Sequence, residues 1–269
     1  MRILIVDDEQ NNRIVLHQLL AAWGQCDLVQ DGTEAVEAFE LSSADGQPYD
    51  LICMDLFMQR MNGDQALRAI RAEEERLAIP AQYRCFVIII TGHEPTGGEN
   101  WMQGDTCTVT LLKPVTRVKL HETLTENGFF PPEAVAGAVH QADSPDQPQL
   151  SPIPGVDLDD ALDRVMGNAR LFQELLSNFL HAHGNDLQKL QAALDGDNPE
   201  LPLRLLHTLK GAAGNIGAIR LHLATRTLET ACRNRLTPAE RAAPMAEFTA
   251  AMNEIMTGLQ NAVPAHRVQ

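Results

Sequence analysis

The sequence predicts two domains of different fold class: an α/β domain with a parallel sheet covered on both faces, followed by an all-α bundle. Three observations support this prediction. Short, continuous apolar runs alternate with amphipathic helical patterns up to residue 126. Residues 131–154 contain six prolines and no apolar stripe, which is typical of a semi-extended linker. Beyond this segment only helical periodicity remains.

In the first domain, the apolar runs have the length and composition of buried strands. They lie at residues 2–6, 26–30, 50–54, 85–90 and 108–112. Amphipathic helical patterns follow four of them, at residues 12–24, 33–42, 63–76 and 116–126. Because parallel strands need crossover connections, we expect a doubly wound, five-stranded parallel sheet over residues 1–130.

In the second domain, apolar residues recur at helical spacing in four segments. These are residues 171–194, 201–217, 219–234 and 238–260. Short breaks such as the sequence GDNPE separate them. We therefore expect an antiparallel four-helix bundle over residues 156–263, joined to the first domain by a linker at residues 131–155.

The composition excludes several classes of function. Lys and Arg number 21 against 36 Asp and Glu, so the net charge of −15 would repel nucleic acid and anionic lipid. The five cysteines are widely spaced and have no CxxC pairing, which indicates reduced thiols rather than disulfides or a zinc site. No run is long enough for a signal peptide or a membrane span. We expect a cytoplasmic protein that binds neither nucleic acid nor membrane.

Polar residues mark the carboxyl ends of the expected strands. They are Asp7 and Asp8 after the first strand, Asp55 after the third, Thr91 after the fourth and Lys113 after the fifth. The carboxyl ends of parallel strands share one edge of a sheet, so these side chains should converge. Carboxylates this close repel one another unless a cation lies among them, and Mg²⁺ is the hard divalent ion that prefers oxygen ligands. One carboxylate could then act as a nucleophile toward a phosphoryl group.

These five positions, in this order, resemble the receiver domain of bacterial response regulators, which has a flavodoxin-like fold. The resemblance covers residues 1–128. It implies that Asp55 is the phosphoacceptor and that Mg²⁺ is bound directly by Asp8, Asp55 and the backbone carbonyl of Phe57. It also implies that Asp7 acts on the ion through water.

The same resemblance assigns Thr91 as the switch hydroxyl and Lys113 as the ion-pair partner of the phosphoryl group, with a cis Lys113–Pro114 bond. Two positions depart from the family pattern. Gln59 stands where most receivers have proline, so the loop after the phosphoacceptor loses a φ restraint. Thr110 replaces the aromatic residue whose rotation usually reports phosphorylation. The aspartate chemistry should survive both changes, whereas the aromatic readout should not.

In the second domain, the stretch LHTLKGAAGNIGA places His207 on a helix. At about 100° per residue, Lys210, Gly211 and Gly214 share its face, opposite the apolar residues. This arrangement predicts an exposed histidine. Glycine costs roughly 1 kcal/mol in a helix interior relative to alanine, so we expect Gly211 and Gly214 to provide clearance for another protein's surface. Lys210 would stabilise an anionic product.

The motif H-x-[LI]-K-G, formed by His207, Leu209, Lys210 and Gly211, resembles that of histidine phosphotransfer (HPt) domains, over residues 156–262. The resemblance implies that His207 carries a phosphoryl group exchanged with an aspartate of a receiver. Implied partners are histidine kinases, response regulators and small phosphodonors. Nothing resembles the nucleotide-binding boxes of a histidine kinase, so we expect only self-phosphorylation and autodephosphorylation. The remaining histidines have no evident partner in the sequence, and His93 is expected beside the acidic pocket.

Two functions remain open from the sequence. The first is a phosphorelay intermediate, in which Asp55 and His207 exchange with each other or serve different partners. A linker of about 24 residues spans roughly 25–30 Å as a flexible coil, which allows either arrangement. The alternative is a regulatory binding protein whose receiver is a switch or phosphate sink and whose bundle only docks. A metal-dependent hydrolase is weakly supported, because no separate substrate pocket is apparent.

Overall fold

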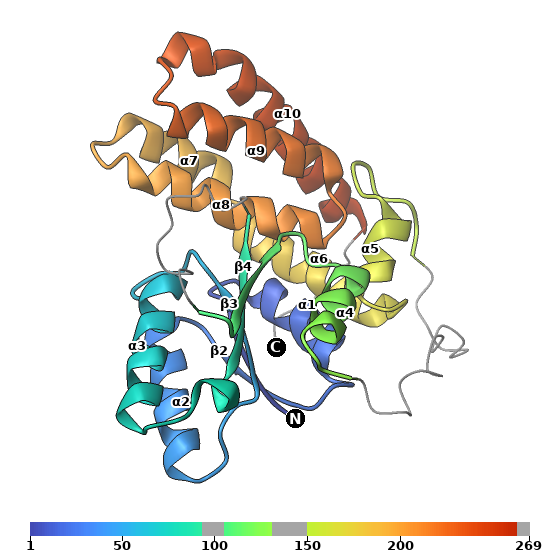
Figure 1. Cartoon of the computed structure of the whole chain (residues 1–269). Coiled ribbons are helices and arrows are strands. Elements are labelled where there is room, and N and C mark those ends of the chain that lie inside the picture. Colours follow the sequence, from blue (N-terminus) through green and yellow to red (C-terminus); the bar gives the residue numbers. More distant parts are fainter. Residues whose placement is uncertain (93–104, 131–149, 263–269) are drawn as a thin grey trace, which may run out of the picture. The chain divides into compact units, whose positions relative to one another are not determined.

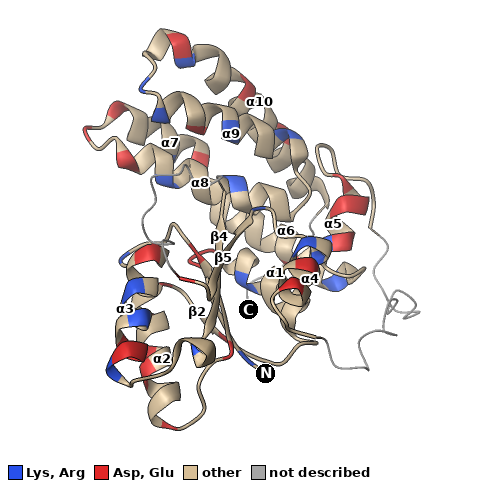
Figure 2. Cartoon of the chain, in the orientation of Figure 1, with Lys and Arg blue, Asp and Glu red and all other residues tan. Residues whose placement is uncertain are grey.

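The computed structural model describes residues 1–92, 105–130 and 150–262 (Figure 1). The chain divides into two compact units, residues 1–139 and 140–269. Each unit is described by itself below. Acidic residues are spread over the helices of both units with basic residues between them (Figure 2).

The first unit contains a five-stranded parallel sheet. Its strands are β1 (Arg2–Val6), β2 (Gln25–Val29), β3 (Leu51–Asp55), β4 (Phe86–Thr91) and β5 (Thr108–Leu112). They lie in the order β2-β1-β3-β4-β5, and all four neighbouring pairs are parallel. The predicted α/β fold class is confirmed, and the three inner strands are almost wholly buried.

Helices cover both faces of this sheet. In Figure 1, α2 (Gly32–Ala44) and α3 (Gly63–Arg76) lie on one face, and α1 (Gln10–Leu20) and α4 (Arg117–Glu126) lie on the other. Side-chain caps begin the helices, as where Asn62 and Gln65 form a reciprocal capping box at α3. One core layer joins alternate residues of β1, β3 and β4 to α2 and α3, and includes Leu4, Val6, Ile52, Met54, Phe39 and Ile70.

The second unit is entirely helical in the part that the structure describes. Its helices are α5 (Leu158–Arg164), α6 (Ala169–His183), α7 (Asp186–Asp195), α8 (Glu200–Asn215), α9 (Ile219–Arg233) and α10 (Pro238–Ala262). The all-α class is confirmed, although α5 was not among the predicted helices. This helix has only 7 residues and few of them are buried, so its apolar periodicity is weak.

The helix predicted over residues 171–194 is wrong as one element, because it breaks between α6 and α7. Gly184 is the C-cap of α6 and Asn185 is the N-cap of α7. At the break, His183 Nδ1 lies 2.6 Å from Asp186 Oδ2, and both side chains are buried. Helical periodicity alone cannot detect this break, since apolar residues continue on both sides of it.

The packed part of the second unit begins before the first helix. Ile153 is buried, and a Cβ on Gly258 of α10 would lie 3.1 Å from the carbonyl oxygen of Pro154. Residues 153–155 therefore pack against α10, inside the segment expected to be linker. No helix of the described residues has the length and apolar character needed to cross a membrane.

Candidate functional site

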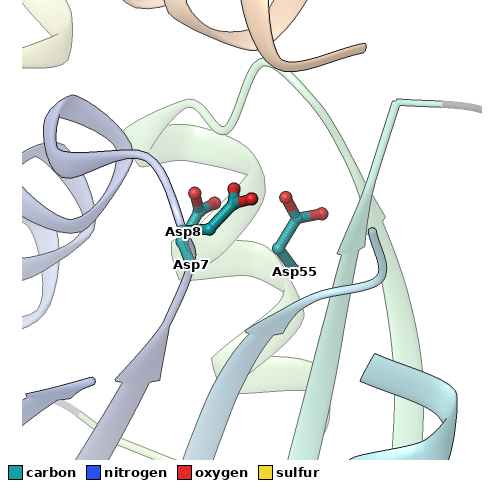
Figure 3. Close-up of side chains that lie close together, drawn as sticks. All are labelled: Asp7, Asp8 and Asp55. Carbon is teal, nitrogen blue, oxygen red and sulfur yellow. The ribbon is translucent and has the colours of Figure 1, made fainter. Parts of the chain in front are cut away.

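Three carboxylates meet at the carboxyl edge of the sheet. Asp7 and Asp8 directly follow β1, and Asp55 is the last residue of β3. The pairing of Val6 with Met54 brings the residues after them to the same level of the sheet. Ligand atoms of Asp7, Asp8 and Asp55 all lie within 4.8 Å of one another (Figure 3). The structure thus brings together the acidic residues that the strand ends predicted.

Lys113 directly follows β5, which β4 separates from β3, and its side chain reaches this cluster. Its Nζ donates to Asp55 Oδ2 at 2.7 Å and to Asp7 Oδ2 at 3.0 Å. Its backbone N–H donates to the carbonyl oxygen of Thr91 at 2.7 Å, and the Lys113–Pro114 peptide bond is cis. The lysine therefore bridges carboxylates that come from two different strands.

Thr91 and Phe57 complete the edge. Thr91 is the last residue of β4 and is buried. Asp55 pairs with Ile90 across the sheet, so Thr91 lies one residue further toward the carboxyl edge than Asp55. The backbone N–H of Phe57 donates to Asp55 Oδ1 at 3.3 Å, while its side chain is exposed. His93, which was expected beside the pocket, lies outside the described residues.

Sequence reasoning missed Asn12. Its Nδ2 donates to Asp7 Oδ1 at 2.8 Å and to Asp7 Oδ2 at 2.9 Å. The backbone N–H of Glu9 donates to Asp7 Oδ1 at 2.9 Å. One feature of the sequence could have revealed it. Asn12 is a polar residue in the first turn of α1, the helix that follows the acidic end of β1. These bonds fix the Asp7 carboxylate in one orientation.

The electrostatics of the cluster follow from burial and mutual repulsion. Burial raises the pKa of Asp7 to about 7, with Lys113 opposing and the Asp55 charge adding to the shift. Burial and the Asp55 charge raise the pKa of Asp8 to about 6. Burial lowers the pKa of Lys113, but the charges of Asp55 and Asp7 reverse this effect and the net shift is upward. One ammonium thus leaves negative charge uncompensated, which suits a divalent cation with oxygen ligands.

The second unit places His207 on α8, beside α9. Its Nδ1 lies 3.6 Å from Glu229 Oε1. His207 therefore has a contact inside its own unit, and its exposure to solvent stays a prediction. The helical wheel gave the direction of the side chain correctly as opposite the apolar face. It could not show that α9 packs along this side of α8.

Lys210 forms a buried ion pair. Its Nζ lies 2.6 Å from Glu229 Oε2, and both side chains are at most 2% exposed. Arg233 also contacts this carboxylate, with its guanidinium 2.9 Å from Glu229 Oε1. Glu229 was not predicted as a site residue, because it belongs to another helix and no local motif marks it. Lys210 is therefore already paired in this structure.

Gly211 and Gly214 lie on α8, four and seven residues after His207. Their suggested role in partner docking stays a prediction.

Among the histidines expected to lack partners, His183 and His222 have polar ones. His183 contacts Asp186, as described above, and its ring packs against Phe179 at an angle of 43°, with ring centroids 4.8 Å apart. His222 Nδ1 lies 2.9 Å from the carbonyl oxygen of Lys210 and links α9 to α8. These contacts depend on the helix break and on helix pairing, which the sequence does not reveal.

Comparison with known proteins identifies both units. Residues 3–125 match the family model of the response regulator receiver domain, and residues 174–266 match that of the Hpt domain. The chain joins a receiver domain to an Hpt domain. The cluster of Asp7, Asp8, Asp55 and Lys113 lies in the receiver domain, and His207 lies in the Hpt domain.

Curated relatives match this chain over part of their own length. The signal transduction histidine-protein kinase BarA of Escherichia coli (strain K12) is 29% identical over 237 residues, which is 87% of this chain and 24% of BarA. The sensory/regulatory protein RpfC of Xanthomonas campestris pv. campestris is 32% identical over 126 residues, 47% of this chain and 16% of RpfC. The chain thus spans about a quarter or less of the length of these curated relatives.

Among solved structures, the receiver domain of the sensor histidine kinase PA1611 from Pseudomonas aeruginosa PAO1 is 34% identical to this chain. The match covers 46% of this chain and 94% of that one, with a TM-score of 0.37. That structure has a magnesium ion coordinated in its active-site cleft.

Proposed function

We propose that this protein is a phosphorelay component whose receiver domain accepts a phosphoryl group on Asp55 and whose Hpt domain carries one on His207. The observation that carries the proposal is the Lys113 ammonium held between Asp7 and Asp55, beside a third carboxylate. This arrangement suits an aspartate nucleophile whose product bears new negative charge.

Mg²⁺ fits the donor set of the receiver domain, because three carboxylates offer oxygen ligands within 4.8 Å of one another. Asp8, Asp55 and the backbone carbonyl of Phe57 would hold the ion directly, and Asp7 through water. When bound, Mg²⁺ neutralises charge on the phosphoryl oxygens. This assignment also accounts for the excess negative charge of the cluster.

Each residue at the receiver site has its own role in the proposed reaction. Asp55 attacks the phosphorus atom of a phosphohistidine, the new O–P bond replaces the N–P bond, and the released imidazole nitrogen keeps the electron pair of the broken bond. Phe57 N–H and Lys113 Nζ hold the two carboxylate oxygens of Asp55 in place. Lys113 balances the charge of the acyl phosphate, and the hydroxyl of Thr91 binds it as a switch.

Partners of the Hpt domain would be receiver aspartates, and those of the receiver domain would be histidine kinases, Hpt domains or small phosphodonors. The activities of the chain itself would be self-phosphorylation and autodephosphorylation. The five free cysteines fit a reducing compartment, so we place the protein in the cytoplasm.

Radiolabelled acetyl phosphate with Mg²⁺ tests the proposal. Label at Asp55 is lost at alkaline pH, whereas label at His207 is lost in acid, so the two sites can be told apart. Asp55→Asn should abolish the first class and His207→Gln the second. Asp45→Asn and His181→Gln change exposed residues outside both sites and serve as matched controls. Wild-type protein that never labels at Asp55 with any phosphodonor would contradict the proposal.

A second candidate function is a regulatory binding protein in which the Hpt bundle docks without transferring phosphate. The contacts of His207 Nδ1 and Lys210 Nζ with Glu229 favour it, since both groups are already engaged inside the Hpt domain. In this case His207→Gln leaves signalling unchanged in cells. The relay proposal expects the same substitution to abolish signalling.

A further inference from the structure

The loop of residues 56–62 joins β3 to α3 and carries backbone groups of the acidic site. The N–H of Phe57 donates to Asp55 Oδ1 at 3.3 Å. Burial raises the pKa of Asp8, and the N–H of Gln59 lies close enough to its carboxylate to oppose this shift. A proline at residue 59 would have no N–H to offer. The position of this loop therefore affects two of the three carboxylates.

Arg60 joins this loop to the start of α2. Its guanidinium pairs with Asp31 Oδ2 and lies 3.2 Å from Glu34 Oε1. Beside these pairs, Gly32 N–H donates to the carbonyl oxygen of Met61 at 3.1 Å. A Cβ on Gly32 would lie only 2.7 Å from that oxygen, so the two backbones are in direct contact. The loop is thus fixed to α2 by a side chain and by the backbone.

The backbone at Arg60 is unfavourable for an arginine. Its φ of 59° lies in the left-handed region, which glycine adopts readily and residues with a Cβ do not. The side chain is 64% exposed, so it gains little from packing. Its ion pairs are therefore the contribution that favours arginine at this position.

We infer that Arg60 is a positioning residue of the metal site: its pairs with two carboxylates at the start of α2 replace the absent proline restraint and hold the loop in place for Mg²⁺. A proline would fix φ through its ring, whereas these pairs act through charge and leave residue 59 with an N–H for Asp8. Groups behind the direct ligands of a metal tune its affinity. This inference rests on the proposed function, because the Phe57 carbonyl is a ligand only in that proposal.

Asp31 offers a way to separate the ion pair from the folding of α2. Its Oδ1 accepts from the N–H groups of Thr33 and Glu34 at 2.8 and 3.1 Å and so caps the helix. Its other oxygen, Oδ2, faces Arg60. Asp31→Asn removes the charge but keeps a capping oxygen, because asparagine caps helices about as well as aspartate. This variant therefore tests the ion pair and not the helix.

Nitrogen-15 NMR of the full chain, titrated with MgCl₂, measures both the metal affinity and the state of the loop. Arg60→Gln should raise the Kd for Mg²⁺ about two- to fivefold, because exposed ion pairs contribute modestly. Asp31→Asn should raise the Kd as well. The double variant should bind no more weakly than Arg60→Gln alone, since both changes remove the same pair. Arg60→Lys keeps the charge and should recover most of the affinity.

Two readouts separate positioning from a general loss of stability. In the metal-free protein, Arg60→Gln should shift the amide signals of Phe57 and Gln59 and leave those of β4 unchanged. At high salt the difference in Kd between wild type and this variant should shrink, because salt screens an exposed ion pair. Arg68→Gln is the matched control, since Arg68 pairs with Asp64 on α3 and its side chain is 67% exposed. It should change neither the Kd nor the two signals.

The failures of the two proposals are distinguishable. If wild type binds Mg²⁺ and Arg60→Gln binds it equally well, the role of Arg60 is overturned, as it is by an additive loss in the double variant. Wild-type protein that binds no Mg²⁺ instead overturns the metal site of the proposed function. The metal-free amide signals need no ion, so they still show whether Arg60 holds the loop.

Discussion

Lys113 Nζ lies 2.7 Å from Asp55 Oδ2, although 58 residues separate the two along the chain. The contact spans two steps of the sheet, from β5 across β4 to β3. The Lys113 side chain is 8% exposed and the Asp55 side chain is 2% exposed, so solvent screens this ion pair little.

Replacing Lys113 by Gln should destabilise the receiver domain in the absence of metal. Removing one partner from a buried ion pair leaves the other charge uncompensated, at a cost of about 3–5 kcal/mol in the free energy of unfolding. Both tryptophans of the sequence lie in the first unit, so tryptophan fluorescence in urea follows this domain alone. Lys119→Gln, an exposed lysine on α4, should show little change. Equal stability of the two variants would contradict a stabilising role for Lys113.

Magnesium should stabilise the receiver domain more at pH 8 than at pH 5.5. The pKa values of Asp7 and Asp8 are raised to about 7 and about 6, chiefly by burial, so the folded state binds more protons than the unfolded state between about pH 4 and 7. Without metal, stability therefore falls as pH rises through this window. Mg²⁺ binds the deprotonated carboxylates, so its stabilising effect grows over the same window.

Thermal unfolding with and without Mg²⁺, at several pH values and followed by tryptophan fluorescence, measures this difference. Asp8→Asn is the informative variant, since it removes one titrating ligand and should flatten the dependence on pH. A magnesium effect that is independent of pH would show that neither carboxylate titrates in this range.

Arg60→Ala should destabilise the loop after Asp55 more than Arg60→Gly does. Arg60 has a φ of 59°, a conformation that favours glycine, and its guanidinium pairs with Asp31 and with Glu34 at 3.2 Å. Alanine loses the ion pairs and keeps the strained backbone. Glycine loses the same ion pairs but relieves the strain. Because the arginine side chain is 64% exposed, we expect a difference of only about 1 kcal/mol.

Urea unfolding of both variants beside wild type checks this order of stability. The Arg60 pairs matter because Gln59 stands where most receivers have proline, so other contacts must hold the loop. Gly32 N–H also donates to the carbonyl oxygen of Met61 at 3.1 Å. Identical stability of the alanine and glycine variants would indicate that the backbone conformation at residue 60 is unstrained.

Much of the receiver domain could be predicted from local pattern. Continuous apolar runs mark strands buried on both faces, and the polar residue after each run marks the shared edge. Because parallel strands all point the same way, sequence order alone places Asp7, Asp55, Thr91 and Lys113 together. Asn12 escaped this reasoning, since its contact with Asp7 depends on how α1 leaves the sheet.

The Hpt domain was predicted less completely. The motif around His207 and the direction of its side chain follow from helical periodicity, which is a property of one helix. The contact of His207 with Glu229, the pairing of Lys210 with Glu229 and the break beside His183 involve two helices each. By itself the sequence determined the two fold classes and pointed to the candidate site residues, because both depend on local periodicity and strand direction. The tertiary structure alone decided which side chains are buried and paired, because a residue's solvent exposure is set by the neighbouring helix and not by its own.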